Sequence, residues 1–262
     1  MKFSWPVLVI TLWILAALAA RLLNLQADVI NLDHILAAPS IHAPLGHDDL
    51  GRNVLVRLMA GAQVALTVAV MVTIITMSFG TAIGLIAGYF GGWVDRLLMQ
   101  ITDVFLAFPG ILLAIAFAAV LGPGLNNLLL ALCLTSWVGY ARLTRAQALS
   151  LRNRQHVLAA ESLGASIPRI MLAHILPLLA APLLVEATYS IAGLIIAEAS
   201  LSFLGLGIQA PQASWGAMLR DGVRYLLVAP HYVLAVGLSL MSLVLAVNVL
   251  GDKLRDRLDV KR

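Results

Sequence analysis

The chain has 262 residues, of which 61% are hydrophobic and only 11% are charged. Soluble domains contain about 45–50% apolar and about 25% charged residues, so a soluble core cannot bury this excess. The net charge of +4 does not indicate nucleic-acid binding, because lysine and arginine lie at the ends of apolar stretches and form no single patch. The one cysteine, Cys133, excludes an intrachain disulfide and a thiolate metal cluster. The composition therefore predicts an all-α, multi-pass protein embedded in membrane lipid.

Apolar stretches of about 20 residues, the length that crosses a bilayer, recur along the chain and predict about six transmembrane helices. They lie near 5–23, 64–88, 98–121, 126–147, 172–197 and 230–250. The first could instead be a secretory signal, since Lys2 precedes it and Ala17-Leu18-Ala19 resembles a cleavage site. Its apolar length and the spans that follow favour an uncleaved helix. We expect residues 1–262 to form a single transmembrane domain.

The distribution of lysine and arginine between the short loops predicts the orientation of the chain in the membrane. With the N-terminus inside, the inside segments hold Lys2, Arg96, Arg142, Arg145, Arg152, Arg154, Arg169, Lys253, Arg255, Arg257, Lys261 and Arg262. The outside segments then hold Arg21, Arg52, Arg57, Arg220 and Arg224. Because an even number of spans returns the chain to its starting side, both termini are predicted to be cytoplasmic. Two longer segments, 24–63 and 200–229, then lie outside.

The cytoplasmic segment 149–171, between the fourth and fifth spans, has the pattern of a helix, a glycine turn and a second helix. No helix breaker interrupts residues 157–163, and Gly164 can adopt the left-handed conformation that ends helices. Ser166 can cap a following helix, whose first turn accepts Pro168. The local sequence therefore predicts two short helices joined at Gly164.

Small side chains in this segment would let the backbone of another protein approach closely. They are Ala159, Ala160 and Gly164, with the charge of Arg154 at the margin. On spacing alone, an ordinary basic loop on the inner side of the membrane is the favoured interpretation.

The motif Ala159-Ala160-x3-Gly164, followed by Leu176-Pro177, resembles the signature loop of permease subunits from binding-protein-dependent ABC importers. In that family the loop forms a coupling helix that sits in a groove of the cytoplasmic ATPase. His174-Ile175-Leu176-Pro177 is similar to the form found in the dipeptide, oligopeptide and nickel branch. Leu158 stands where the family usually has an acidic residue, which puts a salt bridge to the ATPase there in doubt. The resemblance predicts ATPase-coupling roles for Arg154, Leu158, Ala159, Ala160, Gly164 and Pro177.

Further stretches resemble the same family and extend the likeness over nearly the whole chain. In chain order they are 44–53, 91–109, 137–145 and 198–219. In the first of them, His47 and Asn53 replace the usual threonine and aspartate. The resemblance implies a bacterial inner-membrane subunit that works with a paralogous second permease, two ABC ATPase subunits and a periplasmic binding protein. The binding protein would dock on the two outside segments, with candidate contacts at Gly46, Asp48, Gly51, Arg52 and Trp215.

Three acidic residues fall within predicted spans or at the end of one, and inside a span an ionisable side chain costs several kcal/mol unless it faces a cavity or a partner. Glu186 is the deepest, and we expect it either to line the translocation pathway or to form a structural pair with another helix. Asp103 is a pathway candidate too, with anchoring of the inside loop near Arg96 as the alternative. Glu198 lies before the helix-breaking Gly205 and is a candidate gate.

Catalytic motifs are missing from the sequence. There is no Gly-x4-Gly-Lys-Ser/Thr phosphate loop, so ATP hydrolysis is expected in separate subunits, and the chain is not predicted to be an enzyme or to need a cofactor. His34, His42 and His47 cluster in the first outside segment, but the spacing of the last two fits no helical face. Solvated loop histidines are expected there, and no metal site.

The sequence therefore predicts a permease that forms half of a pathway for peptides and couples it to cytoplasmic ATPases. Nickel or a metal chelate is the alternative substrate. An alternative of another class is a secondary transporter, driven by protons through Glu186 or Asp103.

Overall fold

The computed structural model of the chain describes residues 5–259. Among them every regular element is helical, which confirms the predicted all-α fold class. The main helices are α1 (Trp5–Leu22), α2 (Val54–Phe90), α3 (Gly92–Leu106), α4 (Gly110–Leu121), α5 (Leu125–Ser136), α6 (Val138–Leu151), α7 (Gln155–Ser162), α9 (Leu176–Phe203), α10 (Trp215–Val223) and α11 (Pro230–Asp259). Short turns η1 (Leu32–His34), α8 (Ile167–Arg169) and η2 (Ile170–Ile175) complete the list. Lys2, Lys261 and Arg262, on which the predicted orientation partly depends, lie outside the described residues, and the cytoplasmic termini stay a prediction.

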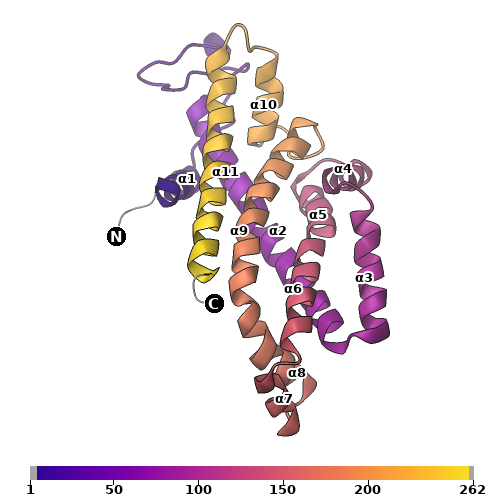
Figure 1. Cartoon of the computed structure of the whole chain (residues 1–262). Helices are drawn as coiled ribbons and strands as arrows, with labels where there is room; N and C mark the ends of the chain where they lie inside the picture. The colour runs from indigo at the N-terminus through magenta and orange to yellow at the C-terminus, as the bar shows by residue number, and fades with distance from the viewer. Residues whose placement is uncertain (1–4, 260–262) are drawn as a thin grey trace.

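Helix α2 is the central element and runs obliquely through the molecule against α1, α6 and α9 (Figure 1). It begins at Val54, ten residues before the predicted span at 64–88, because Asn53 caps it by accepting hydrogen bonds from the backbone N–H groups of Leu55 and Val56. The helix thus extends beyond the predicted span, because Arg57 in its first turns lowers the local hydropathy on which the span was based. The extra turns form the edge of a cap at one end of the molecule.

The third predicted span, 98–121, is not a straight helix. Helices α3 and α4 meet at an angle of 83°, with the break between Leu106 and Gly110. Pro109 takes the N-cap position of α4, where its missing N–H costs no hydrogen bond, while the same ring prevents α3 from continuing. The fourth predicted span, 126–147, is similarly divided into α5 and α6 on either side of Trp137.

The last two predicted spans are longer in the structure. The fifth joins the π-helical turn η2 to α9, and the helix then continues to Phe203. The sixth, α11, continues past Gly251 to Asp259, although the sequence predicts that it ends there. Gly251 lies within α11 where α9 packs closely on it: a Cβ atom at this position would lie 2.5 Å from Thr188 Oγ1, so the glycine allows close contact between the two helices.

Four helical segments in the described part of the chain are long and apolar enough to cross a membrane: 5–22, 54–90, 167–203 and 230–258. The bent pair α3 and α4 adds at most a fifth. Helices α5 and α6, with 12 and 14 residues, are each shorter than a crossing needs. The membrane-embedded fold is therefore supported, while the count of six crossings stays a prediction.

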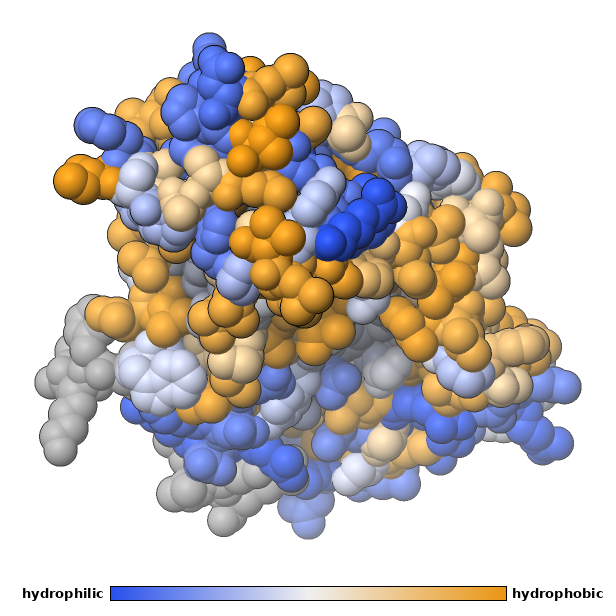
Figure 2. All heavy atoms as spheres, turned by 90° about the horizontal axis from the view of Figure 1, so that it is seen from above, coloured by the Kyte–Doolittle hydropathy of each residue, from blue (hydrophilic) through white to orange (hydrophobic). Residues whose placement is uncertain are grey.

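The two ends of the molecule differ in construction. At one end, residues 24–53 and 204–229, here named the cap, surround the outer turns of α2 and α11, and at the opposite end α7 and α8 project from the bundle (Figure 1). Viewed from the cap end, polar residues are mixed with apolar ones, and apolar residues spread over the flanks (Figure 2). The main buried core joins α1, α2, α4, α5, α9, α10 and α11. A second core, including Leu85, Ala148 and Val157, holds the base of α7.

Candidate functional site

Segment 149–171 folds as two short helices joined by a left-handed glycine, as the sequence predicts. Helix α7 ends in a Schellman motif: the N–H of Gly164 donates to the carbonyl of Glu161 at 2.9 Å, and the N–H of Ala165 donates to that of Ala160 at 3.0 Å. Gly164 adopts a φ of +79°, which side chains rarely adopt. Ser166 occupies the N-cap position of α8, but its side chain makes no capping hydrogen bond.

The two alanines of the motif face different ways. Ala160 and Val157 are buried against the chain's own second core, so α7 is fixed to the bundle by its inner face. Ala159 and Gly164 are exposed, as are Arg154 and Pro177. The exposed apolar side chains of this segment are Leu158 (46% exposed), Leu163 (89%) and Ile167 (43%). The segment therefore presents a small, partly apolar surface around Ala159 and Gly164.

Helices α2 and α6 touch along a row of glycines. Cβ atoms at Gly80, Gly84 and Gly88 would lie 2.4 Å from Trp137 O, 2.2 Å from Ala141 O and 2.7 Å from Ala148 Cβ, respectively. Small residues spaced four apart allow two helix backbones in a membrane to approach closely. The sequence analysis missed this feature, although the spacing Gly80-x3-Gly84-x3-Gly88 within an apolar helix is a signal for it.

Two ion pairs join α3 to α6 at the end of the bundle that carries α7. Asp95 makes a bidentate contact with Arg145, with Oδ2 2.7 Å from Nη2. Asp103 lies 2.6 Å from Arg142 Nη2. Asp103 is therefore joined to α6 through Arg142, and its roles in the pathway or in anchoring the inside loop near Arg96 stay predictions.

Because the two pairs differ in exposure, they are expected to differ in strength. Asp95→Asn removes a pair whose side chains are 15% and 34% exposed, and should lower the free energy of unfolding by about 1–2 kcal/mol. Asp103→Asn removes a pair whose side chains are 59% and 54% exposed and should cost less than about 1 kcal/mol. Thermal unfolding of the two purified variants in the same detergent measures the difference. Equal shifts in melting temperature would contradict this ranking.

Glu186 lines a cavity of about 370 Å³ between α6, α9 and α11. Gln147, Tyr189 and Arg255 supply further polar groups to its wall. Tyr189 donates a hydrogen bond to Asp252 Oδ1 at 2.6 Å, which ties α9 to α11 at this level. Glu186 thus faces an open space within the bundle, and its role in the pathway stays a prediction.

Glu198 is fully buried inside the chain. Its Oε1 accepts a hydrogen bond from Ser202 Oγ at 2.8 Å, and that hydroxyl accepts another from the backbone N–H of Ile208 at 3.2 Å. The carboxylate therefore holds the end of α9 to the turn that follows it. The observed contacts of Glu198 are structural, within the chain, and a gating role for this residue stays a prediction.

Asp48 is the centre of a buried network of charges in the cap. Its Oδ1 accepts hydrogen bonds from the backbone N–H groups of Leu50 and Arg52, and its Oδ2 lies 2.7 Å from Arg52 Nε. Arg57, from the first turns of α2, approaches the same Oδ2 at 3.3 Å and also lies 3.5 Å from Asp28. The network therefore pins α2 to the cap loop.

The remaining docking candidates also lie inside the cap. A Cβ atom at Gly51, whose φ is +68°, would lie 1.7 Å from Asn31 O, and one at Gly46 would lie 2.5 Å from Ala37 O. Trp215 is fully buried and donates a hydrogen bond from Nε1 to Leu58 O at 3.0 Å. Together with the buried Asp48 and Arg52, these residues shape the cap from within. Docking on the cap stays a prediction, and any contact must be made by their exposed neighbours.

Two titratable side chains of the cap loop are shifted by their surroundings. Burial lowers the pKa of His47, and the nearby His34, whose ring centroid is 5.1 Å away, lowers it further. Burial raises the pKa of Asp49, and the neighbouring Asp48 charge adds to that shift. In residues 5–259, the structure groups no three His, Cys, Asp or Glu side chains in a way that could hold a metal ion.

The profile of one protein family, described as "Binding-protein-dependent transport system inner membrane component", matches residues 80–260. The chain belongs to this family. The match includes the glycine row of α2, both ion pairs, segment 149–171 and all of α9, α10 and α11. The protein is thus an inner-membrane permease subunit of a binding-protein-dependent ABC importer.

Two curated relatives resemble the permease over nearly its whole length. The dipeptide transport system permease protein DppC of Alkalihalophilus pseudofirmus is 43% identical over 255 residues, covering 97% of this chain and 84% of the relative. The glutathione transport system permease protein GsiD of Escherichia coli is 42% identical over 262 residues, covering 100% of this chain and 86% of the relative. Residues 24–53 of the cap, which precede the family match, therefore also lie within the alignments to these relatives.

Among solved structures, a chain of the MetNI methionine ABC transporter in an inward-facing conformation has a TM-score of 0.57. It is 19% identical and covers 77% of the permease and 95% of that chain. At this identity the likeness shows the fold alone.

Proposed function

We propose that this permease forms half of a translocation pathway for peptides and that segment 149–171 couples it to cytoplasmic ATPase subunits. The relatives DppC and GsiD are permeases for dipeptides and for glutathione, itself a tripeptide, which supports a short peptide as substrate. The partners are a paralogous second permease, two ABC ATPases and a periplasmic binding protein. The cap faces the periplasm, and α7 faces the cytoplasm.

The observation that carries the coupling proposal is a continuous packed connection from α7 to the cap. Val157 of α7 is buried in the same core as Ala148 of α6 and Leu85 of α2. The glycine row then clamps α6 to α2, and α2 runs unbroken to Arg57 in the cap. Because packed helices move as rigid bodies more readily than they deform, closure of the ATPases on α7 would tilt these helices as one unit. Such a tilt alternates access to the pathway.

The exposed surface around Ala159 is the contact that this mechanism requires, and it can be tested without disturbing the fold. Ala159→Trp adds bulk to an exposed position of α7, so the subunit should still fold. We expect peptide transport by the complete transporter to fall more than tenfold and the ATPases to copurify less well. The measurements are uptake into proteoliposomes and the ratio of ATPase to permease after affinity purification.

A matched control is Ile41→Trp, which adds the same bulk to a cap residue that is 96% exposed. It should leave the copurification of the ATPases unchanged. If Ala159→Trp kept both transport and copurification, the coupling role of this surface would be wrong. Binding of peptides, but not of Ni²⁺ complexes, to the binding protein encoded beside the permease would separate the peptide from the nickel alternative.

A further inference from the structure

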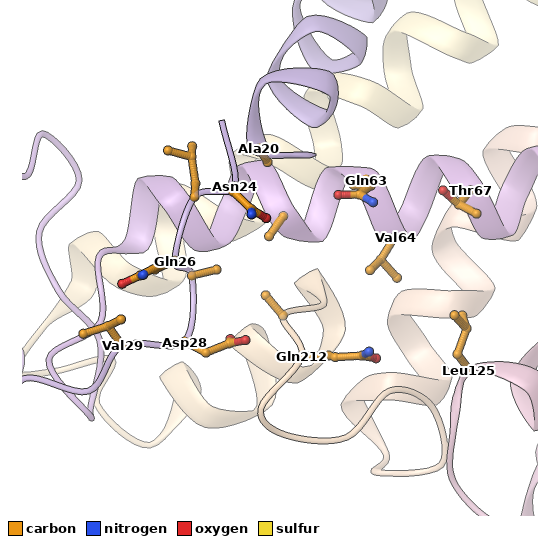
Figure 3. Close-up of a pocket in the computed structure, with 14 residues that line it drawn as sticks. Ala20, Asn24, Gln26, Asp28, Val29, Gln63, Val64, Thr67, Leu125 and Gln212 are labelled. Atoms are coloured by element: carbon orange, nitrogen blue, oxygen red, sulfur yellow. The ribbon is translucent and has the colours of Figure 1, made fainter. Parts of the chain in front are cut away.

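A further cavity in the described part of the permease opens on the cap side, between the end of α1, α2 and the cap. It encloses about 750 Å³, within the range of about 300–1,000 Å³ that is typical of small-molecule sites. Its wall comes from four parts of the chain that are distant in sequence: residues 20–29, the outer turns of α2, Leu125, and residues 212–213 (Figure 3). We name it the cap pocket.

Most of the polar side chains that line the cap pocket are carboxamides. Four carboxamide side chains line it, together with one hydroxyl and one carboxylate: Asn24, Gln26, Gln63, Gln212, Thr67 and Asp28. A carboxamide offers one acceptor and two donors, the same groups that a peptide bond needs to satisfy its own N–H and C=O. Between them lie the small apolar residues Ala60, Val64 and Ala213, which can pack against side chains of many kinds. Such a wall can hydrogen-bond to the backbone of a bound peptide and tolerates variation in the side chains of that peptide.

Among the described residues that line the cap pocket, the charge is negative. Asp28 is the charged member of the lining, and its carboxylate is 44% exposed. Its Oδ1 lies 3.5 Å from Arg57 Nη1, but that guanidinium is shared with the fully buried Asp48 at 3.3 Å. Asp28 therefore retains negative charge toward the pocket, where it would favour a cation such as a free ammonium group.

From these observations we infer that the cap pocket binds short peptides that enter by their free N-terminus. The ammonium group pairs with Asp28, and the peptide bonds hydrogen-bond to Gln63 and Gln212 from opposite sides. Histidine and cysteine, the side chains that suit nickel best, are missing from the described lining, so a metal chelate fits this site poorly. The inference rests on the proposed import of peptides and adds a site at which the permease itself selects its substrate.

The position of the pocket also connects it to the moving part of the molecule. Gln63 and Thr67 lie one turn apart on α2, the helix that the glycine row clamps to α6 further along. A peptide held between α2 and the loop at Gln212 would respond to any tilt of α2 relative to the cap. Tilting of the helix pair would therefore weaken the site and release the peptide.

Occupancy of the pocket can be measured independently of transport. In the complete transporter, reconstituted in lipid nanodiscs, Cys133→Ser with Thr67→Cys places one thiol of this subunit on the exposed pocket wall. We expect trialanine to slow maleimide labelling of that thiol at least fivefold, and N-acetyl-trialanine to slow it less than twofold. The control variant Ile41→Cys, on a cap residue outside the pocket lining, should label at the same rate with and without either peptide.

Two substitutions separate recognition from a structural effect. Gln63→Leu keeps the size of the side chain and should raise the concentration of trialanine that gives half-protection at least tenfold. Asp28→Asn should remove the difference between trialanine and its acetylated form, which a mere loosening of the cap would not do. Copurification of the ATPase subunits with each variant shows that the transporter has assembled.

The outcomes distinguish this inference from the proposed function. Trialanine uptake without any protection of Thr67→Cys would overturn the cap pocket and leave peptide import standing. Equal protection by the free and acetylated peptides would overturn recognition of the N-terminus by Asp28. A transporter that imports no peptide, although its binding protein holds trialanine, would overturn the proposed function itself.

Discussion

Gly84→Ala is expected to destabilise the permease by more than about 3 kcal/mol and to abolish transport. Its new Cβ atom would lie 2.2 Å from Ala141 O and 2.8 Å from Thr144 Cβ. Overpacking of a core costs about 1–3 kcal/mol when side chains can yield. Here the nearest obstacle is a backbone carbonyl within α6, so the two helices must separate along the whole glycine row. Thermal unfolding of the purified subunit and peptide uptake by the complete transporter measure the two effects.

Gly193→Ala is the matched control for this prediction. It makes the same substitution in the interior of another long apolar helix, α9, but a Cβ atom there meets nothing within 4 Å. Because alanine is the better helix former by about 1 kcal/mol, this variant should be as stable as the original protein or slightly more stable. A similar loss of stability in both variants would show that the close contact between α2 and α6 has no special importance.

Local rules predicted the parts of the fold that depend on neighbours in sequence. The turn at Gly164 follows from the need for a left-handed residue at the end of α7, and the structure shows the expected φ of +79°. Apolar runs likewise located α1 and most of α2, α9 and α11. In each case the deciding interaction, a backbone hydrogen bond or contact with lipid, can be inferred from a short window of the chain.

The same rules failed where a distant contact decides the structure. A window average of hydropathy gives one span at 98–121, because it cannot show that the chain bends by 83° before Pro109. It also ends α11 at Gly251, whereas the helix continues to Asp259 and this glycine serves close packing against Thr188, about 60 residues away in sequence. Helix length in these places is set by packing partners, which a single sequence does not reveal.

In the cap, residue types indicated which positions matter, but not whether their side chains face a partner or the interior of the chain. The sequence resemblance suggested that Asp48, Gly51 and Trp215 contact a docked protein, and the structure shows all three buried within the chain. A glycine at a positive φ or an aspartate between two arginines can be retained for folding as readily as for binding. The distinction depends on which face of the loop is covered by α2 and α10, and that is a tertiary property.

Asp48→Ala is expected to unfold the cap locally, at a cost of about 3–5 kcal/mol. The substitution removes the carboxylate that accepts from Arg52 Nε and lies 3.3 Å from Arg57, and both guanidinium side chains are almost fully buried. Buried charges that lose their partner are far more costly than the original pair was favourable. The backbone N–H groups of Leu50 and Arg52 also lose their acceptor. Limited proteolysis within residues 24–53 of the assembled transporter should therefore accelerate at least tenfold.

Asp33→Ala provides the comparison, because Asp33 is exposed on the short turn η1 of the same loop and its loss should change stability by less than about 0.5 kcal/mol. If the cap must be ordered to receive a binding protein, stimulation of ATP hydrolysis by that protein should be lost in Asp48→Ala and kept in Asp33→Ala. Basal ATP hydrolysis should be kept in both, since α7 and its core lie at the opposite end of α2. Normal stimulation in an Asp48→Ala transporter with a protease-sensitive cap would show that docking does not require the ordered loop, and would place the contact on residues 204–229 instead.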